Sequence, residues 1–131
     1  MKNEQLANST IFPLGQKVEA NFIGDAYLHM VFTDPTPLNA SIGNVTFAPG
    51  ARNHWHSHKV GQVLLVTGGE GWYQEEGKTA QLLKTGDVVN IPPNVKHWHG
   101  ATKDSWFVHL AITPGQTDWF EPVNNDWYDN L

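Results

Sequence analysis

The sequence contains no cysteine among its 131 residues, which excludes disulfides, thiolate metal ligands and cysteine nucleophiles. It also lacks a long apolar run: the longest aliphatic stretch, residues 63–66, is far too short to span a membrane, and residues 1–5 begin no signal-peptide core. No basic run is present and the net charge is −5, which argues against nucleic acid or an anionic membrane as a partner. A cytoplasmic location is therefore the default expectation.

The chain has the length and composition of one globular domain spanning residues 1–131, with 40% hydrophobic and 16% charged residues. Between residues 40 and 115, glycines and prolines interrupt every candidate helical period. Short apolar or alternating segments separated by turn residues predict strands instead. The expected strands are 26–32, 44–48, 62–67, 71–74, 79–83, 88–91 and 106–112, and residues 118–131 are expected to form a short helix or an extended arm. This pattern predicts an all-β sandwich or barrel.

Histidine is the residue type that points to function, because six of the seven histidines lie between positions 54 and 109. They are His54, His56, His58, His97, His99 and His109. Side chains alternate along a strand, so in an extended segment His54, His56 and His58 point to one face. For the same reason His97 and His99 share a face of their own segment. His109 lies within the last expected strand. A small barrel has one interior, so three separate segments can direct imidazoles into the same place.

A divalent metal requires three or four converging ligands, and neutral imidazole or amide groups are suitable donors. A His-x-His pair on one strand supplies two, Gln62 can supply an amide oxygen, and His97 can supply a third imidazole. Such a site keeps the full charge of the ion, which makes it a strong Lewis acid. His29 is isolated from this cluster and is interpreted as a structural residue.

The spacing of these residues resembles the two motifs of the cupins. The first motif fits residues 50–69, with Gln62 at the position where most cupins have glutamate. The second fits residues 86–101, although Asn94 replaces a glycine and Ala101 replaces an asparagine. Asparagine also tolerates a left-handed turn, so the first replacement is mild. The resemblance implies a single-domain double-stranded β-helix, that is, a jelly-roll barrel.

Within the cupins, the stretches 54–62, 96–101 and 109–112 resemble a subgroup of small bacterial members that includes the manganese-dependent (R)-selective hydroxynitrile lyases. The resemblance implies one divalent ion per chain, with manganese preferred and iron, nickel, zinc and copper as alternatives. The implied ligands are His56, His58, Gln62 and His97. It further implies a catalytic role for His99 and a place in the pocket for His109. His54 is an addition to the subgroup pattern, either beside the ligands, or as an alternative ligand, or at the barrel mouth.

The expected function is that of a metal-dependent enzyme acting on a small oxygen-bearing substrate. In its sharpest form it is a hydroxynitrile lyase, in which His99 takes the hydroxyl proton or protonates the departing cyanide. Val45, Phe107 and Leu110 are candidates for the apolar part of the pocket. The same ligand set also suits a metal-dependent dioxygenase of the quercetinase or oxidative alkene-cleaving type. A third alternative is a cupin that binds a small molecule without catalysis.

Four tryptophans fall on outward positions of the expected strands: Trp55, Trp72, Trp98 and Trp106. Tryptophan is favoured at contacts between subunits. The sequence therefore predicts a sheet face covered by a second copy of the chain, as in a homodimer or homotetramer.

Overall fold

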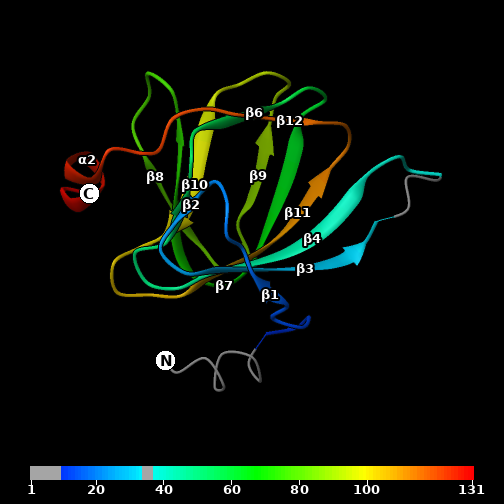
Figure 1. The fold of residues 1–131 in the computed structure, drawn as a ribbon, viewed down its shortest axis with the longest axis horizontal. Helices are drawn as coiled ribbons and strands as arrows, with labels where there is room; N and C mark the ends of the chain where they lie inside the picture. The colour runs from blue at the N-terminus through cyan, green and yellow to red at the C-terminus, as the bar shows by residue number, and fades with distance from the viewer. Residues whose placement is uncertain (1–9, 34–36) are drawn as a thin grey trace.

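The computed structural model describes residues 10–33 and 37–131 (Figure 1). The polar composition of about the first twelve residues predicts a loosely ordered N-terminus, and most of that stretch lies outside the described residues. The strands are β1 (Gln16–Lys17), β2 (Phe22–Ile23), β3 (Ala26–Phe32), β4 (Ser41–Phe47), β5 (Arg52–Asn53), β6 (His56–His58), β7 (Gln62–Glu75), β8 (Gln81–Lys84), β9 (Val88–Ile91), β10 (His97–Ala101), β11 (Phe107–Thr113) and β12 (Thr117–Trp119). One short helix, α2 (Asn125–Asp129), follows them. In the described part of the chain, no helix is long and apolar enough to cross a membrane.

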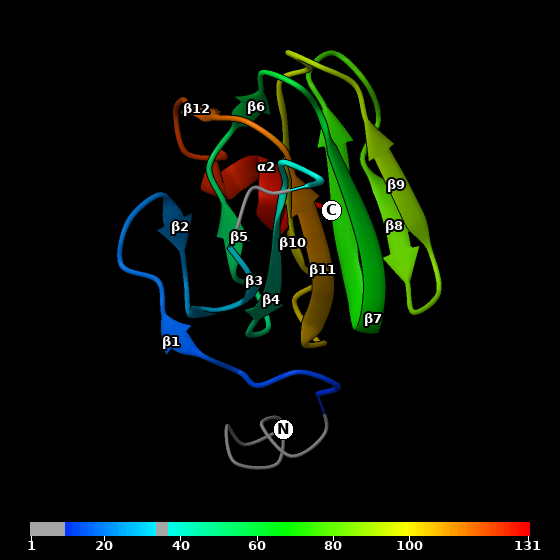
Figure 2. The ribbon, with the colours of Figure 1, turned by 90° about the vertical axis from the view of Figure 1, so that its right-hand side faces the viewer.

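The long strand β7 joins two halves of one curled sheet. Its first half pairs with β9 and β11, and β11 continues through β4 and β3 to β1. Its second half pairs with β8 and β10, and β10 continues to β5 and β2. The short strands β6 and β12 pair with each other, and β6 also pairs with β10. Figures 1 and 2 show the two halves facing each other, with β6 and β12 across one end. This is the all-β jelly roll that the sequence predicts, in a single domain.

The sequence predicts that a strand ends before Gly68 and Gly69, but β7 continues through both glycines. The two expected strands 62–67 and 71–74 form one strand, because the register with β11 shifts between Val108 and His109 and absorbs the irregularity. Gly69 has φ +70, and a Cβ there would lie 1.6 Å from the backbone oxygen of Trp106. Only glycine fits this close approach. The expected strands 26–32 and 88–91 are confirmed at both ends.

The core fills the space between the two halves of the sheet. Its fully buried side chains come from alternate positions of the strands, as expected for one inward face of each strand. Phe47 lies at its centre and stacks on Phe107, with 5.8 Å between ring centroids. The same Phe47 ring contacts the imidazoles of His99 and His109 at 5.9 and 5.6 Å. The apolar core therefore continues directly into the histidine cluster.

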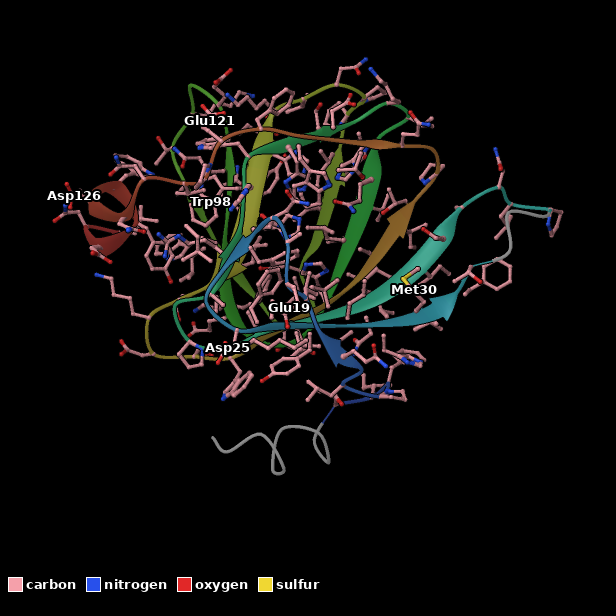
Figure 3. The ribbon with its side chains drawn as sticks, viewed as in Figure 1. Glu19, Asp25, Met30, Trp98, Glu121 and Asp126 are labelled. Carbon is pink, nitrogen blue, oxygen red and sulfur yellow. The ribbon has the colours of Figure 1, made fainter. Side chains whose placement is uncertain are left out.

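The chain's own C-terminus covers much of the tryptophan face. Trp98 is fully buried and packs with Val123 and Tyr128 of the C-terminal segment, and Trp55 and Trp72 pack against this cluster. Figure 3 shows Trp98 on the side of β10 that faces α2. The expectation that a second subunit covers Trp98 is therefore wrong, because the segment after β12 turns back over it. Assembly into a homodimer or homotetramer stays a prediction.

Candidate metal centre

Strands β6 and β10 bring the two histidine motifs together from opposite parts of the sequence. They are antiparallel, with His56 directly opposite His97, and their rings are 4.2 Å apart at the centroids. The turn before β10 contains Asn94 with φ +63, the left-handed conformation that the sequence predicts. One ring nitrogen from each of His56, His97 and His99 lies within 4.8 Å of the others, and all three side chains are buried.

Backbone carbonyl groups fix the orientation of two of these imidazoles. The Nδ1 of His56 donates to the carbonyl of His54 at 2.7 Å, and the Nδ1 of His97 donates to the carbonyl of Val95 at 2.9 Å. A neutral imidazole that donates from Nδ1 carries its lone pair on Nε2. The Nε2 of His97 is buried without a hydrogen-bond partner among the described residues. Such an arrangement is typical of metal-ligating histidine, which usually donates its other ring N–H.

His58 and Gln62 present two further bare atoms. The Nδ1 of His58 contacts the hydroxyl of Thr117 at 2.9 Å, and the Nε2 of Gln62 donates to the hydroxyl of Thr113 at 2.8 Å. The opposite atoms, His58 Nε2 and Gln62 Oε1, are buried and find no partner within residues 10–33 and 37–131. Buried polar atoms normally have partners, and these two acceptors are suited to bind a cation.

The donor chemistry fits a divalent ion, because the four predicted ligands offer neutral nitrogen and amide oxygen. The ring of His58 lies 5.0 Å from that of His56 and 5.2 Å from that of His97. The tightest group of nitrogens nevertheless contains His99 instead of His58. The two sets share His56 and His97 and differ in whether His58 or His99 supplies the third imidazole.

Burial keeps this cluster neutral. It lowers the pKa of His97 to about 4 and that of His109 to about 3. Burial also lowers the pKa of His56 and His99, and neighbouring imidazoles lower both further, because several positive charges cannot share a small apolar space. For His58, burial lowers the pKa and the adjacent Gln62 opposes the change. Neutral imidazoles are the form that binds a metal.

His99 is held by two neighbours at the edge of the candidate metal centre. The side-chain oxygen of Asn53 accepts the backbone N–H of His99 at 2.9 Å, which fixes the amide orientation. The amide nitrogen of Asn53 then lies 3.1 and 3.3 Å from the two ring nitrogens of His99. The Nε2 of His109 lies 3.2 Å from the Nδ1 of His99. Asn53 cannot be found from the sequence, because nothing distinguishes a lone asparagine before the first histidine motif from a turn residue.

His56, His58, His99 and His109 form the floor of a cavity of about 430 Å³, within the range of small-molecule sites, whereas His97 is fully buried and does not line it. Of the predicted pocket residues, Val45 and His109 line it. Phe107 does not, because it is buried behind Phe47, and Leu110 does not, because it lies on the opposite face of β11 from His109. His54 is half-buried and lies outside the cavity lining.

The cavity wall is apolar and uncharged. Val18, Phe22, Leu28 and Met30 form much of the remaining wall, and Trp119 lines the cavity beside His56. Figure 3 shows Met30, a residue of β3, on the side of the molecule where β3 and β4 lie. Among the described residues, no lysine, arginine, aspartate or glutamate lines the cavity. The cavity therefore suits a neutral small molecule with an apolar group better than it suits an anion.

Comparison with known proteins identifies the class. The family model described as a cupin domain matches residues 43–113, a range that includes all four predicted ligands. An (R)-mandelonitrile lyase from Granulicella tundricola is 41% identical over 111 residues, which cover 82% of this chain and 85% of that protein. The chain thus belongs to the cupin family.

Solved structures agree with this assignment. The crystal structure of a cupin-like protein from Thermotoga maritima is 44% identical, covers 93% of this chain and 96% of its own, and superposes with a TM-score of 0.89. A cupin 2 conserved barrel domain protein from Rhodopseudomonas palustris shares the fold at 21% identity and a TM-score of 0.69, over 85% of this chain and 77% of that one. Family membership, a lyase-named relative and a three-histidine group together support an enzyme with a divalent metal site.

Proposed function

We propose that this chain is a manganese-dependent hydroxynitrile lyase that cleaves a neutral cyanohydrin into an aldehyde and hydrogen cyanide. The observation that carries the proposal is the buried set of bare, neutral donor atoms at the floor of an uncharged cavity. The 41% identity with an (R)-mandelonitrile lyase favours the same substrate class. His56, His58, Gln62 and His97 are the proposed ligands. A bound divalent ion would lower the pKa of a substrate hydroxyl at this floor.

In this proposal His99 handles the proton. A ring nitrogen of neutral His99 accepts the proton of the cyanohydrin hydroxyl. The electrons of that O–H bond form the aldehyde carbonyl as the C–C bond breaks, and the bonding pair leaves with cyanide. His99 then returns the proton to cyanide, so hydrogen cyanide and aldehyde are the only products. Burial favours this return, because it lowers the pKa of His99 and makes its imidazolium a stronger acid than an exposed one.

The cavity wall supports a neutral substrate with an apolar substituent. Leu28 and Met30 remain 37% and 38% exposed on the wall, so an apolar group resting on them would remove that surface from water. A carboxylate in the same position would lose its hydration and meet no cationic side chain of the described wall. The cavity thus favours a cyanohydrin over a dicarboxylate.

The test is mandelonitrile cleavage under nitrogen by protein that has been stripped of metal and reloaded with manganese. We expect benzaldehyde and cyanide in equal amounts, and we expect EDTA to abolish their release. Free manganese at the same concentration and the His99→Ala variant are the controls. Release no faster than with free manganese would refute the lyase proposal. Oxygen uptake with the same substrate would favour the dioxygenase alternative.

The ligand assignment is tested separately by elemental analysis. His58→Ala should lose the metal, whereas His99→Ala should keep it. The opposite result would show that His56, His97 and His99 hold the ion, as their closer grouping allows.

A further inference from the structure

The segment from Thr113 to Trp119, here called the support segment, touches three of the four proposed metal ligands. It begins at the last residue of β11 and ends with β12, and the turn between them contains Gly115. We infer that the support segment positions the metal ligands, and that metal binding in turn holds the chain after β11 in place. The inference rests on the metal centre of the proposed function and does not depend on the lyase activity.

Thr113 sets the orientation of the Gln62 amide. Its hydroxyl accepts from the Nε2 of Gln62 at 2.8 Å, so the amide nitrogen is occupied and Oε1 is turned away from Thr113. That Oε1 is the buried acceptor without a partner in the described chain. An amide turned the other way would present an N–H donor, which cannot bind a cation. In this orientation Thr113 holds the Gln62 amide with its oxygen free to act as a ligand.

Thr117 acts on His58 in the same manner. The two residues face each other across the β12–β6 pair, and the Thr117 hydroxyl lies 2.9 Å from the Nδ1 of His58. A hydroxyl that accepts the Nδ1 proton keeps the lone pair of His58 on Nε2 and restricts rotation of the ring. The Nε2 is buried and bare among the described residues, as ligation requires.

Trp119 covers the third ligand. It is the cross-strand partner of His56, and the two rings lie 4.7 Å apart at the centroids with an interplanar angle of 33°. Its other neighbour is Phe22 at 6.1 Å. The indole thus blocks His56 from swinging out of the floor of the cavity.

The same contacts connect the metal centre to the C-terminus. Strand β12 is three residues long and pairs only with β6 among the described strands, so it has little stability of its own. Beyond it, Phe120 and Glu121 exchange backbone hydrogen bonds with Trp55, at 2.8 and 3.0 Å. A ligand that fixes His58 and Gln62 therefore stabilises the docked support segment, and a docked support segment strengthens metal binding by the same factor.

Manganese affinity and hydrogen exchange test the two directions of this coupling. Free manganese is measured by electron paramagnetic resonance during titration of the metal-stripped full chain. Thr113→Val and Thr117→Val should each bind manganese about 10–100-fold more weakly, the usual effect of losing a group that orients a ligand. Thr113→Ser and Thr117→Ser keep the hydroxyl and should restore most of the affinity. Thr67→Val is the matched control, because Thr67 is a half-buried threonine on the outer face of β7 whose hydroxyl donates to the carbonyl of Val108.

In the wild-type chain, manganese should slow amide exchange in residues 114–122 and leave β8, which contacts none of the proposed ligands, unchanged. Wild-type affinity in both valine variants, or unchanged exchange in residues 114–122 of the loaded wild type, would overturn the inference while leaving the metal centre intact. Failure of the wild type to bind manganese would instead overturn the metal centre of the proposed function, and the inference with it. The exchange experiment uses no variant and therefore remains decisive if a valine variant fails to fold.

Discussion

Acid should destabilise the metal-free protein strongly, because its buried histidines fold in the neutral form. In the unfolded chain each histidine has a pKa near 6.5, whereas in the fold burial lowers the pKa of His97 to about 4 and that of His109 to about 3. The unfolded state therefore binds more protons than the fold in this window. Stability is fully present above pH 6.5 and is lost as the pH falls toward the folded values.

The expected loss is large compared with the stability of an average domain. Each tenfold change in proton affinity corresponds to about 1.4 kcal/mol. At pH 4.5, which lies two pH units below the unfolded pKa, His97 and His109 are each expected to cost about 3 kcal/mol. His56 and His99 change in the same direction. A typical domain has only about 5–15 kcal/mol in total, so the metal-free chain should be close to unfolding at pH 4.5.

Urea denaturation followed by tryptophan fluorescence measures this effect. With a slope of about 2 kcal/mol per molar, the urea midpoint of the metal-free protein should fall by about 2–3 M between pH 7 and pH 4.5. Between pH 9 and pH 8 these histidines are almost fully neutral in both states, so that interval is the internal control. Manganese should raise the midpoint at pH 7, and this gain should persist at pH 4.5 and disappear only as the pH falls below the folded pKa of about 4 for His97, where protons displace the ion. A flat midpoint between pH 7 and pH 4.5 would refute the neutral buried cluster.

Three further predictions concern single side chains. Asn53→Ala should lower kcat by about 10-fold or more while manganese content stays at the wild-type level, because His99 loses the amide that holds it; an unchanged kcat would show that Asn53 has no positioning role. Trp98→Ala should lower the free energy of unfolding by about 3–5 kcal/mol, because it empties the centre of the cluster under the C-terminal segment; a loss below about 1 kcal/mol in urea denaturation would contradict this packing. Met30→Lys should weaken turnover of mandelonitrile and improve turnover of a cyanohydrin that carries a carboxylate on its ring, because the lysine adds a cation to an uncharged wall; equal losses for both substrates would place the aromatic ring elsewhere.

The sequence predicts the site better than it predicts the edges of the fold. Because side chains alternate along a strand, the sequence predicts that His56 and His58 point to the same face. A closed barrel has one interior, so the sequence also predicts that His97 meets them there. The structure places these residues on β6 and β10. Short strands such as β1, β2 and β5 have no alternating pattern to detect, because each contains two residues. Their pairing is decided by neighbours that are distant in the chain, which a local pattern cannot show.

The outward tryptophans show why a surface pattern does not identify its partner. Burial of Trp98 was predictable from its size, but the covering element was not, because a second copy and the chain's own C-terminus offer the same apolar contact. The structure uses Val123 and Tyr128, and Arg52 lies over the Tyr128 ring at 4.1 Å to hold the segment down. The Tyr128 hydroxyl donates to the carbonyl of Ala101 at 2.5 Å. These contacts join residues that are far apart in sequence, so a local sequence pattern does not predict them.

The bare atoms at the floor of the cavity explain why metal binding and folding should be coupled in this chain. A buried polar atom without a partner costs about 1–3 kcal/mol. His58 Nε2, Gln62 Oε1 and His97 Nε2 are three such atoms in the described chain, so each of them that water does not reach adds to the cost of the metal-free fold at one place. In the proposed metal centre a divalent ion would remove that cost, because each atom would become a ligand. A mutation that fills the floor with apolar side chains should therefore stabilise the metal-free chain while it abolishes metal binding, which is the behaviour of a site kept for function at the expense of stability.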